Sequence, residues 1–262
     1  MVCNDTMSSL PRVNILGVGI SAITMPQALE QIAAWIETGA RQYVCACTVH
    51  TVMECQRDER MRQAVNRAGL AVPDGMPLVW LGRRQSKLAV SRVYGPDLML
   101  ALGQLSVERG YSHFFYGGAA GVAELLAHNL QARFPGLVVA GTCSPPFRPL
   151  TSEEEAHFVR QINQAQPDIV WVGLGTPKQD LWMAAHRAEL TAPLLIGVGA
   201  AFDFHTGRLP QAPPWMQQAG LEWLFRLWQE PRRLWYRYLV YNPLFLFLIL
   251  LQAAGLKRYS SQ

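Results

Sequence analysis

The sequence is poor in the groups that build disulfides, metal sites and nucleoside-triphosphate sites. Its 262 residues include five cysteines, with no C-x-x-C pair and no zinc-type spacing. The G-x-x-x-x-G-K-[ST] motif of P-loop enzymes is absent, and so is a D-x-D pair that could clamp a divalent cation. We therefore expect reduced, mostly buried thiols, as in a cytosolic protein, and neither a cofactor nor an obligatory metal.

Charge and long apolar runs are also scarce. Charged residues make up 16% of the chain and hydrophobic residues 50%, so a substantial core is expected and disorder is not, except at the ends. Residues 1–12 lack a basic segment followed by an apolar stretch, which predicts a flexible leader and not a signal peptide. The apolar run Leu244–Leu251 has eight residues, whereas a membrane-spanning helix needs about 20.

Apolar runs typical of strands alternate with segments of helical spacing over residues 13–212. This alternation predicts an α/β domain, with a Rossmann-like and mainly parallel sheet that has helices on both faces. Ser152 is expected to cap a helix that has three acidic residues in its first turn. The predicted strands are 13–18, 43–49, 112–116, 137–141, 168–174 and 194–199, with a shorter one near 71; the predicted helices are 25–38, 57–68, 96–109, 119–133, 152–164 and 177–190.

Glycine pairs follow four of the predicted strands, at 17/19, 117/118, 173/175 and 197/199. Ligands of open parallel sheets bind beyond the carboxyl ends of the strands, where glycine lets backbone N–H groups approach phosphate. One pair alone favours a simple turn, but four pairs favour a phosphate-bearing ligand. GVGISA, from Gly17, has the form of a dinucleotide fingerprint, but the next strand ends without an acid, which makes a nicotinamide-dependent oxidoreductase a weak alternative.

Two carboxylates follow predicted strands. Asp74, in VPDGMPLVW, is either a turn residue or a base that takes a proton from an attacking hydroxyl. Asp203, in GVGAAFDFHTG, either binds sugar hydroxyls or fixes a loop. The histidines at 50, 113 and 205 are scattered, which favours structural or substrate-contacting roles over metal binding.

The segment 213–262 forms a basic, aromatic and apolar appendage. From Arg226 onward it carries six basic residues and one acid, so its charge of +5 leaves −1 on residues 1–225. Its first helix is expected to have Leu221, Leu224, Phe225 and Trp228 on one side. Pro231 is expected to break or restart it. The composition favours a helix lying on an anionic membrane surface. A core helix with a solvated edge and a diphosphate site built from arginines remain alternatives.

Several stretches resemble the WecG/TagA/CpsF family, glycosyltransferase family 26. The resembling pieces run in family order over about residues 13–241, and the most specific are GLGTPKQDLW and GLEWLFRLWQEPRR. The resemblance implies an inverting, metal-independent transferase. It would move a sugar from a UDP-sugar to a polyprenyl-diphosphate-linked saccharide, as a peripheral protein on the cytoplasmic face of the bacterial inner membrane. No nucleic-acid partner is expected, and self-association is left open.

The resemblance also implies roles for particular residues. Asp74 would be the catalytic base, Thr48 and His50 would line the pocket beside it, and Arg92 would bind the donor phosphate. Gln179 and Asp203 would contact donor or acceptor sugar, with Gly118 and Gly175 in the walls of the donor cleft. Four arginines of the appendage would cover the site and hold a diphosphate at the membrane: Arg226, Arg232, Arg233 and Arg237.

Two departures from the family pattern bear on the donor. Many members have T-P-N where this chain has Thr48-Val49-His50, and R-A-P where it has Gln211-Ala212-Pro213. Both resemble the exopolysaccharide branch that includes the xanthan-type glucosyltransferase, so a β-linked hexose from UDP-glucose is the favoured expectation. The alternative is an N-acetylmannosamine or N-acetylmannosaminuronate transferase for teichoic acid linkage units or common antigen. A non-catalytic nucleotide-binding protein is a more distant one.

Overall fold

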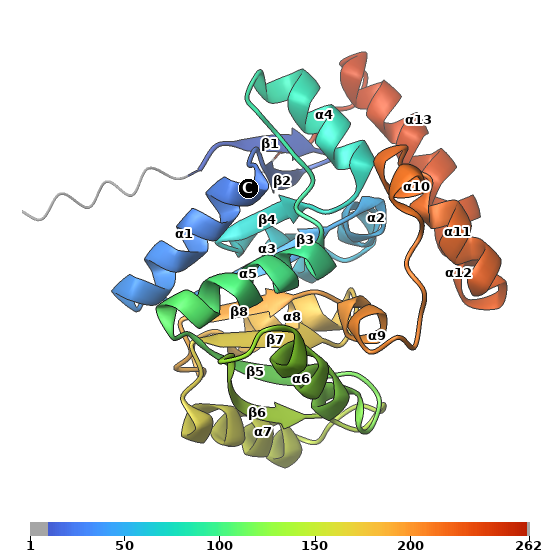
Figure 1. The fold of residues 1–262 in the computed structure, drawn as a ribbon. Helices are drawn as coiled ribbons and strands as arrows, with labels where there is room; N and C mark the ends of the chain where they lie inside the picture. The colour runs from blue at the N-terminus through green and yellow to red at the C-terminus, as the bar shows by residue number, and fades with distance from the viewer. Residues whose placement is uncertain (1–9, 261–262) are drawn as a thin grey trace, which may run out of the picture.

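A central parallel sheet lies between two layers of helices in the computed structural model, which describes residues 10–260 (Figure 1). The sheet has six strands in the order β4-β3-β8-β7-β5-β6, and every neighbouring pair is parallel. The predicted α/β class and parallel sheet are thus confirmed. The strands are β3 (Gln42–Cys47), β4 (Leu70–Pro73), β5 (Ser112–Gly117), β6 (Val138–Cys143), β7 (Ile169–Gly173) and β8 (Leu194–Gly197).

Both faces of the sheet are covered, which explains why the strands are apolar without interruption. Along β5, Phe115 faces one core while Phe114 and Tyr116 face the other, as the two-residue period of a strand requires. One layer contains α1 (Met25–Thr38), α5 (Gly95–Arg109), α6 (Val122–Arg133) and α9 (Ala201–His205). The other contains α2 (Val49–Arg57), α3 (Glu59–Arg67), α7 (Ser152–Ala165) and α8 (Lys178–His186).

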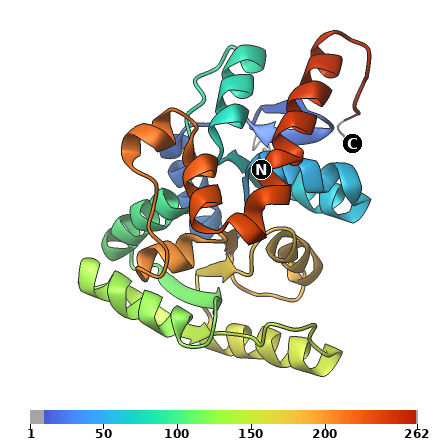
Figure 2. The same ribbon diagram turned by 90° about the vertical axis from the view of Figure 1, so that its right-hand side faces the viewer.

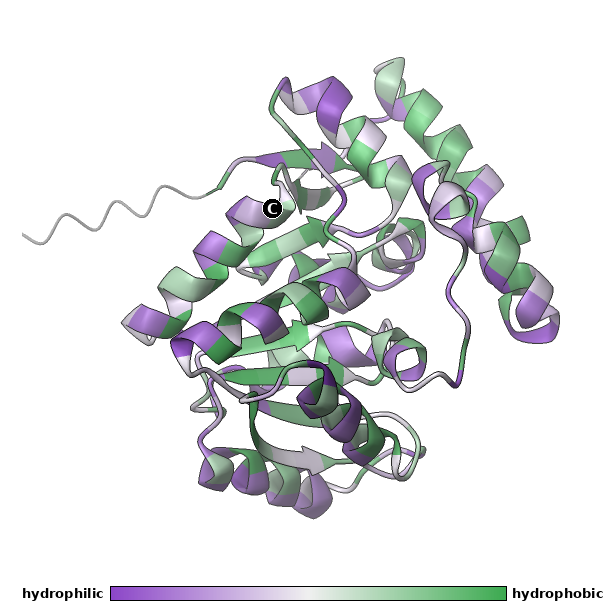
Figure 3. Cartoon of the chain, viewed as in Figure 1, coloured by the Kyte–Doolittle hydropathy of each residue, from purple (hydrophilic) through white to green (hydrophobic). Residues whose placement is uncertain are grey.

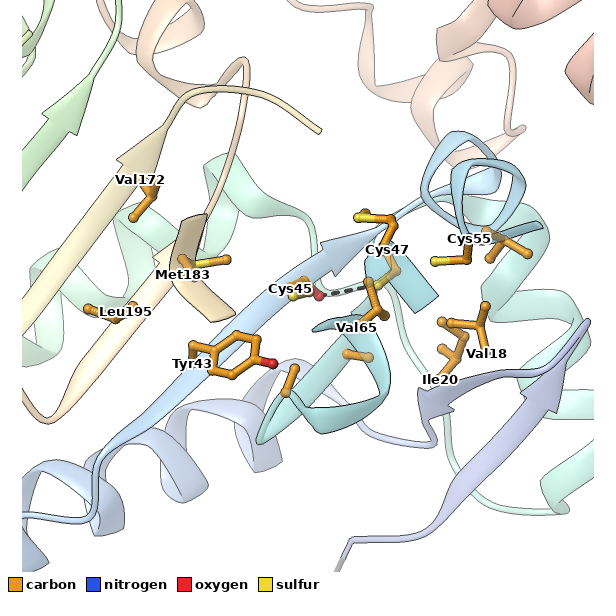
Figure 4. Packing of buried hydrophobic residues seen from close by; sticks show 14 of the residues in the cluster. Val18, Ile20, Tyr43, Cys45, Cys47, Cys55, Val65, Val172, Met183 and Leu195 are labelled. Carbon is orange, nitrogen blue, oxygen red and sulfur yellow. Dashed lines mark hydrogen bonds between the residues drawn. The ribbon is translucent and has the colours of Figure 1, made fainter. Parts of the chain in front are cut away.

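Three of the cysteines are core residues. Cys45 and Cys47 of β3 and Cys55 of α2 lie in one cluster of buried hydrophobic residues, part of which Figure 4 draws. Burial raises the pKa of the Cys45 and Cys47 thiols well above their usual range, so both stay protonated at neutral pH. The expected burial of the thiols holds for these three, while Cys143 is half-buried.

The prediction of a single strand over 13–18 is wrong. The segment folds into an antiparallel hairpin of β1 (Arg12–Ile15) and β2 (Val18–Ser21), which is separate from the main sheet. Gly17 lies in its turn with φ of +82°, a conformation that favours glycine. GVGISA is therefore a hairpin and not the strand-to-helix turn that a dinucleotide site requires.

The helices differ from the predictions in three further places. The helix expected over 57–68 is α3, and α2, which precedes it, was not anticipated. The cap of α7 is Thr151, whose hydroxyl accepts from the Glu154 N–H, and Ser152 is the first helical residue. The expected acidic first turn is present. The helix α4 (Met76–Ser86) was also missed.

The C-terminal appendage consists of α10 (Pro214–Gln218), α11 (Glu222–Gln229), α12 (Pro231–Leu239) and α13 (Tyr241–Ala253). Pro231 begins α12, so the predicted restart at this residue is confirmed. Figure 2 shows these helices in orange and red across the side of the molecule. At the far end of α13, the Gln252 side chain accepts from the Leu16 N–H at 3.1 Å and donates to the Asn14 carbonyl at 3.0 Å. Residues 1–9 of the predicted leader lie outside the described residues.

Candidate active site

A cleft of about 1580 Å³ lies at the carboxyl ends of the strands and is bounded on its open side by the appendage. The structure brings eleven of the twelve predicted site residues to its walls, and Arg232 is exposed outside it. The hairpin glycines Gly17 and Gly19 also lie outside its lining. The lining residues are Thr48, His50, Asp74, Arg92, Gly118, Gly175, Gln179, Asp203, Arg226, Arg233 and Arg237.

Asp74 lies where β4 ends, and its backbone is fixed to the neighbouring strand. Its N–H donates to the Cys47 carbonyl at 2.9 Å, and its Oδ2 accepts from the Gly95 N–H at the start of α5, at 3.1 Å. The side chain is only 13% exposed. Burial raises the pKa of Asp74 to about 6, although Arg92 opposes the increase. A carboxylate with a pKa near neutrality suits a general base.

Arg92 organises the surroundings of Asp74. Its Nε donates to the Asp74 carbonyl at 2.5 Å, and its Nη1 donates to Gln217 at 3.3 Å. Its Nη2 lies 2.5 Å from Oε2 of Glu222 and 3.6 Å from Oδ1 of Asp74. All three nitrogens therefore have protein partners here, and the role of Arg92 as a donor-phosphate ligand stays a prediction.

Glu222 was not among the predicted site residues. It is the first residue of α11 and lines the cleft, where its Oε1 also accepts from the Tyr94 hydroxyl at 3.0 Å. The signal was available, because Glu222 lies inside GLEWLFRLWQEPRR. It was missed because the basic residues of that stretch drew the interpretation toward anion binding.

Gln179 joins the glycine turns that follow β7 and β8. Its buried Oε1 accepts from the Gly175 N–H at 3.1 Å and from the Gly199 N–H at 3.0 Å. Both turns adopt positive φ at these glycines. The two N–H groups are thus engaged by the Gln179 side chain and not directed at a ligand. Contact of Gln179 with a sugar stays a prediction.

Tight packing explains the glycines after β5. A Cβ added at Gly117 would lie 2.6 Å from the carbonyl carbon of Gly173 on β7, and Gly117 has φ of +129°. Gly118, with φ of +76°, donates its N–H to the Gly173 carbonyl at 3.1 Å. These turns therefore bring the ends of β5 and β7 close together under the cleft.

His50 is a neutral side chain in the wall of the cleft. It follows Thr48, which caps α2, and its ring stacks on Tyr241 of α13 with centroids 5.9 Å apart. Burial lowers the pKa of His50 to about 3, and the charges of Arg237 and Arg226 contribute. Its Nδ1 is buried and has no hydrogen-bond partner among residues 10–260.

Arg237 is the strongest candidate for an anion-binding residue. Its buried Nε has no hydrogen-bond partner within residues 10–260, and no carboxylate of that range is ion-paired with it. Burial lowers the pKa of Arg237. A buried and uncompensated guanidinium is costly unless a ligand supplies negative charge. Arg226, by contrast, lies 3.7 Å from Glu230, with which the exposed Arg233 pairs at 2.8 Å.

Asp203 fixes a loop through its backbone. Its carbonyl accepts from the N–H groups of Arg208 and Leu209 at 2.9 and 3.2 Å, and its carboxylate lies 3.4 Å from Nε of Arg208. The carboxylate still lines the cleft, so a contact with sugar stays a prediction. No group of three or more His, Cys, Asp or Glu side chains placed to hold a metal occurs in the described part of the chain.

The outer face of the appendage is apolar. Leu246, Phe247 and Leu250 of α13 are each more than half exposed, as is Trp228 of α11. Figure 3 shows α13 in green along most of its length. Residues Pro231–Ala253 are long and apolar enough to cross a membrane by length and composition, with only 22% of the apolar window buried. The helical segment is therefore longer than the eight-residue run considered from sequence.

Comparisons with known proteins bear on this site. The glycosyl transferase WecG/TagA/CpsF family model matches residues 13–259. Two similar curated proteins are both called N-acetylglucosaminyldiphosphoundecaprenol N-acetyl-beta-D-mannosaminyltransferase. The one from Bacillus spizizenii is 28% identical over 71% of this chain and 70% of its own length. The one from Staphylococcus aureus is 24% identical over 88% of this chain and 89% of its own length.

Proposed function

We propose a donor and an acceptor for this chain, which belongs to the WecG/TagA/CpsF family and is therefore a glycosyltransferase. The proposed reaction transfers N-acetylmannosamine from UDP-N-acetylmannosamine to N-acetylglucosaminyl-diphosphoundecaprenol. The names of the two relatives support this donor and acceptor. They do not support the glucose and exopolysaccharide expectation. The observation that carries the proposal is Asp74, a buried carboxylate with a pKa of about 6, in the same cleft as the unpaired guanidinium of Arg237.

The reaction proceeds by a single displacement with inversion. The acceptor hydroxyl oxygen attacks the anomeric carbon of the donor while Asp74 takes the hydroxyl proton. The bond from that carbon to the diphosphate oxygen breaks, and UDP leaves with the electron pair. Arg237 and Arg226 lie where they can stabilise the charge on the departing diphosphate, since a fixed positive group in a partly dry cleft needs little reorganisation.

In this proposal, the apolar face of the appendage would hold the cleft at the membrane. Its exposed leucine, phenylalanine and tryptophan side chains would enter the interface of the cytoplasmic leaflet, and Arg232 and the exposed Arg233 would meet anionic headgroups. The acceptor is a lipid, so its diphosphate must reach the cleft while its chain stays in the bilayer. A peripheral position on the inner membrane satisfies both needs.

A hexose donor such as UDP-glucose is the second candidate. It is favoured by His50, which stands where many family members have asparagine and which lines the cleft, with its buried Nδ1 3.7 Å from Oε1 of Glu54. A neutral imidazole and a carboxamide present different donors and acceptors to a sugar substituent. The two candidates differ only in the donor.

The test is a UDP-release assay with a short-chain polyprenyl-diphosphate N-acetylglucosamine acceptor, a panel of UDP-sugars, and EDTA throughout. We expect acceptor-dependent release with UDP-N-acetylmannosamine and none with the Asp74→Asn variant. Release with UDP-glucose alone would favour the hexose donor. UDP binding without release from any sugar would overturn the proposal in favour of a non-catalytic nucleotide-binding protein.

A further inference from the structure

Glu222 lies beside the catalytic centre although it belongs to the appendage. Its carboxylate is 16% exposed and makes a 2.5 Å ion pair with Nη2 of Arg92. The same Nη2 is 3.6 Å from Oδ1 of Asp74. One guanidinium group therefore serves two carboxylates, and the closer of the two comes from α11.

The two contacts of Nη2 differ in strength. Charge-assisted hydrogen bonds between arginine and carboxylate are about 2.7–2.9 Å long, and they favour the ionised, weakly basic form of the carboxylate. At 3.6 Å, Oδ1 of Asp74 is beyond this distance, whereas Oε2 of Glu222 is 2.5 Å from the same nitrogen. The Tyr94 hydroxyl fixes the other oxygen of Glu222 at 3.0 Å, so the Glu222 carboxylate cannot easily turn away.

We propose that Glu222 is a positioning residue for the glycosyl transfer, which holds Arg92 off the Asp74 carboxylate when α11 covers the cleft. The docked appendage thereby keeps Asp74 basic and also forms part of the wall of the cleft. This inference rests on the proposed function, because it requires Asp74 to act as the base.

The other groups that face Asp74 do not supply this effect. Arg92 and Arg237 are cationic and favour the ionised carboxylate. Cys47 on β3 and Tyr94 are neutral, because burial raises the pKa of both above their usual ranges. Glu222 is the negative charge among these groups, and it raises the pKa of Asp74.

The experiment compares the pH dependence of kcat/KM for the full-length wild type, Glu222→Gln and Glu230→Gln. Glu230 is the matched control because it is also an appendage carboxylate paired with arginine, and it is not among the residues that line the cleft. We expect the acidic limb of Glu222→Gln to move down by at least about 0.5 pH unit, with a kcat about 10-fold lower. Glu230→Gln should keep the wild-type midpoint. An unchanged midpoint in Glu222→Gln would overturn the proposal.

A second measurement does not depend on turnover. The carboxyl carbon of ¹³C-labelled aspartate is titrated by NMR, and the Asp74 signal is assigned by its loss in Asp74→Asn. The Asp74 midpoint should fall in Glu222→Gln even if that variant is inactive, and a wild-type midpoint contradicts the proposal. If Glu222→Gln does not fold, Glu222→Asp replaces it. We then expect a smaller fall of the Asp74 midpoint, and a wild-type midpoint again contradicts the proposal. Wild-type turnover in Asp74→Asn would instead show that Asp74 is not the general base.

Discussion

The chemistry of the cleft depends on how burial changes individual side chains, and Asp74 is the leading case. Its folded-state pKa of about 6 lies above the value of 3.8 that is usual for an aspartate in an unfolded chain, so the unfolded chain releases this proton first as pH rises. The contribution of Asp74 to stability is therefore favourable below about pH 4 and is lost between pH 4 and 6. A group that costs stability at neutral pH is kept for its reactivity.

Asp74→Asn should abolish most transfer without unfolding the protein. We expect kcat to fall roughly 10²–10⁴-fold, since a general base contributes about that much. The melting temperature at pH 7 should be equal to or above that of the wild type, because the unfavourable buried charge is gone. Steady-state UDP release and thermal unfolding check the two parts. Loss of activity with a lower melting temperature would indicate a merely structural residue.

The activity of the wild type should fall as pH drops through about 6 and level off above it. Protonation of Asp74 removes the base, whereas His50, whose pKa is lowered to about 3, stays neutral across this range. His50→Asn should therefore leave the acidic limb in place and act on donor choice. The measurement is kcat/KM against pH with two UDP-sugars. If the acidic limb moves in His50→Asn, the titration does not belong to Asp74 alone, and the assignment is wrong.

Gln179→Ala tests whether the two glycine turns need their clamp. The variant leaves the Gly175 and Gly199 N–H groups without their partner, at a cost of about 1–3 kcal/mol for each if buried. We expect a lower melting temperature and a raised KM for the donor, with kcat affected less. Isothermal titration with UDP and thermal unfolding provide the values. An unchanged melting temperature would mean that the clamp is not needed.

Among the elements, α12 presents a matched pair of arginines. Arg237 lines the cleft, and its buried Nε has no hydrogen-bond partner in residues 10–260, whereas Arg232 is exposed outside the cleft. Arg237→Ala should weaken UDP binding about 10–100-fold, since hydrogen bonds to charged groups are worth about 1.5–3 kcal/mol. Arg232→Ala should bind UDP as the wild type does. Titration of both variants with UDP checks this, and equal affinities would contradict it.

Sequence patterns predicted the elements whose signal is local. The strands from 43 to 197 and most helices were found because continuous apolar runs and helical spacing set them. The β1–β2 hairpin was missed because Gly17 turns the chain inside an apolar run, and only pairing with β2 reveals it. The helix α2 was missed because it begins at once after β3, where Thr48 is both strand end and cap.

The sequence was enough to predict most residues of the site, but it did not predict the contacts between them. Asp74 could be placed at a strand end from its neighbours in sequence. Its link through Arg92 to Glu222 joins segments more than 100 residues apart, and no periodicity encodes such a contact. Gln179 likewise looks like a sugar ligand in sequence, and only the fold shows its two glycine partners.

At the scale of the whole molecule, the apolar face of the appendage should determine where the enzyme resides. A triple variant with Leu246→Ser, Phe247→Ser and Leu250→Ser should bind phosphatidylglycerol vesicles at least roughly 10-fold more weakly. Its melting temperature should stay the same, since these side chains are exposed. A variant with Leu125→Ser and Val138→Ser, exposed on the body, is the control. Vesicle flotation that does not distinguish the two would contradict the membrane assignment.

The bonds of Gln252 to the hairpin have a consequence for how the protein is made. All six strands of the sheet are complete by Gly197, so the sheet takes no strand from the appendage. The partners of Gln252, Leu16 and Asn14, are by then already in place near the beginning of the chain. Glu222 and Arg237 follow all six strands in the chain. The site is therefore complete only when α11 and α12 have been made and have packed against a sheet whose strands precede them.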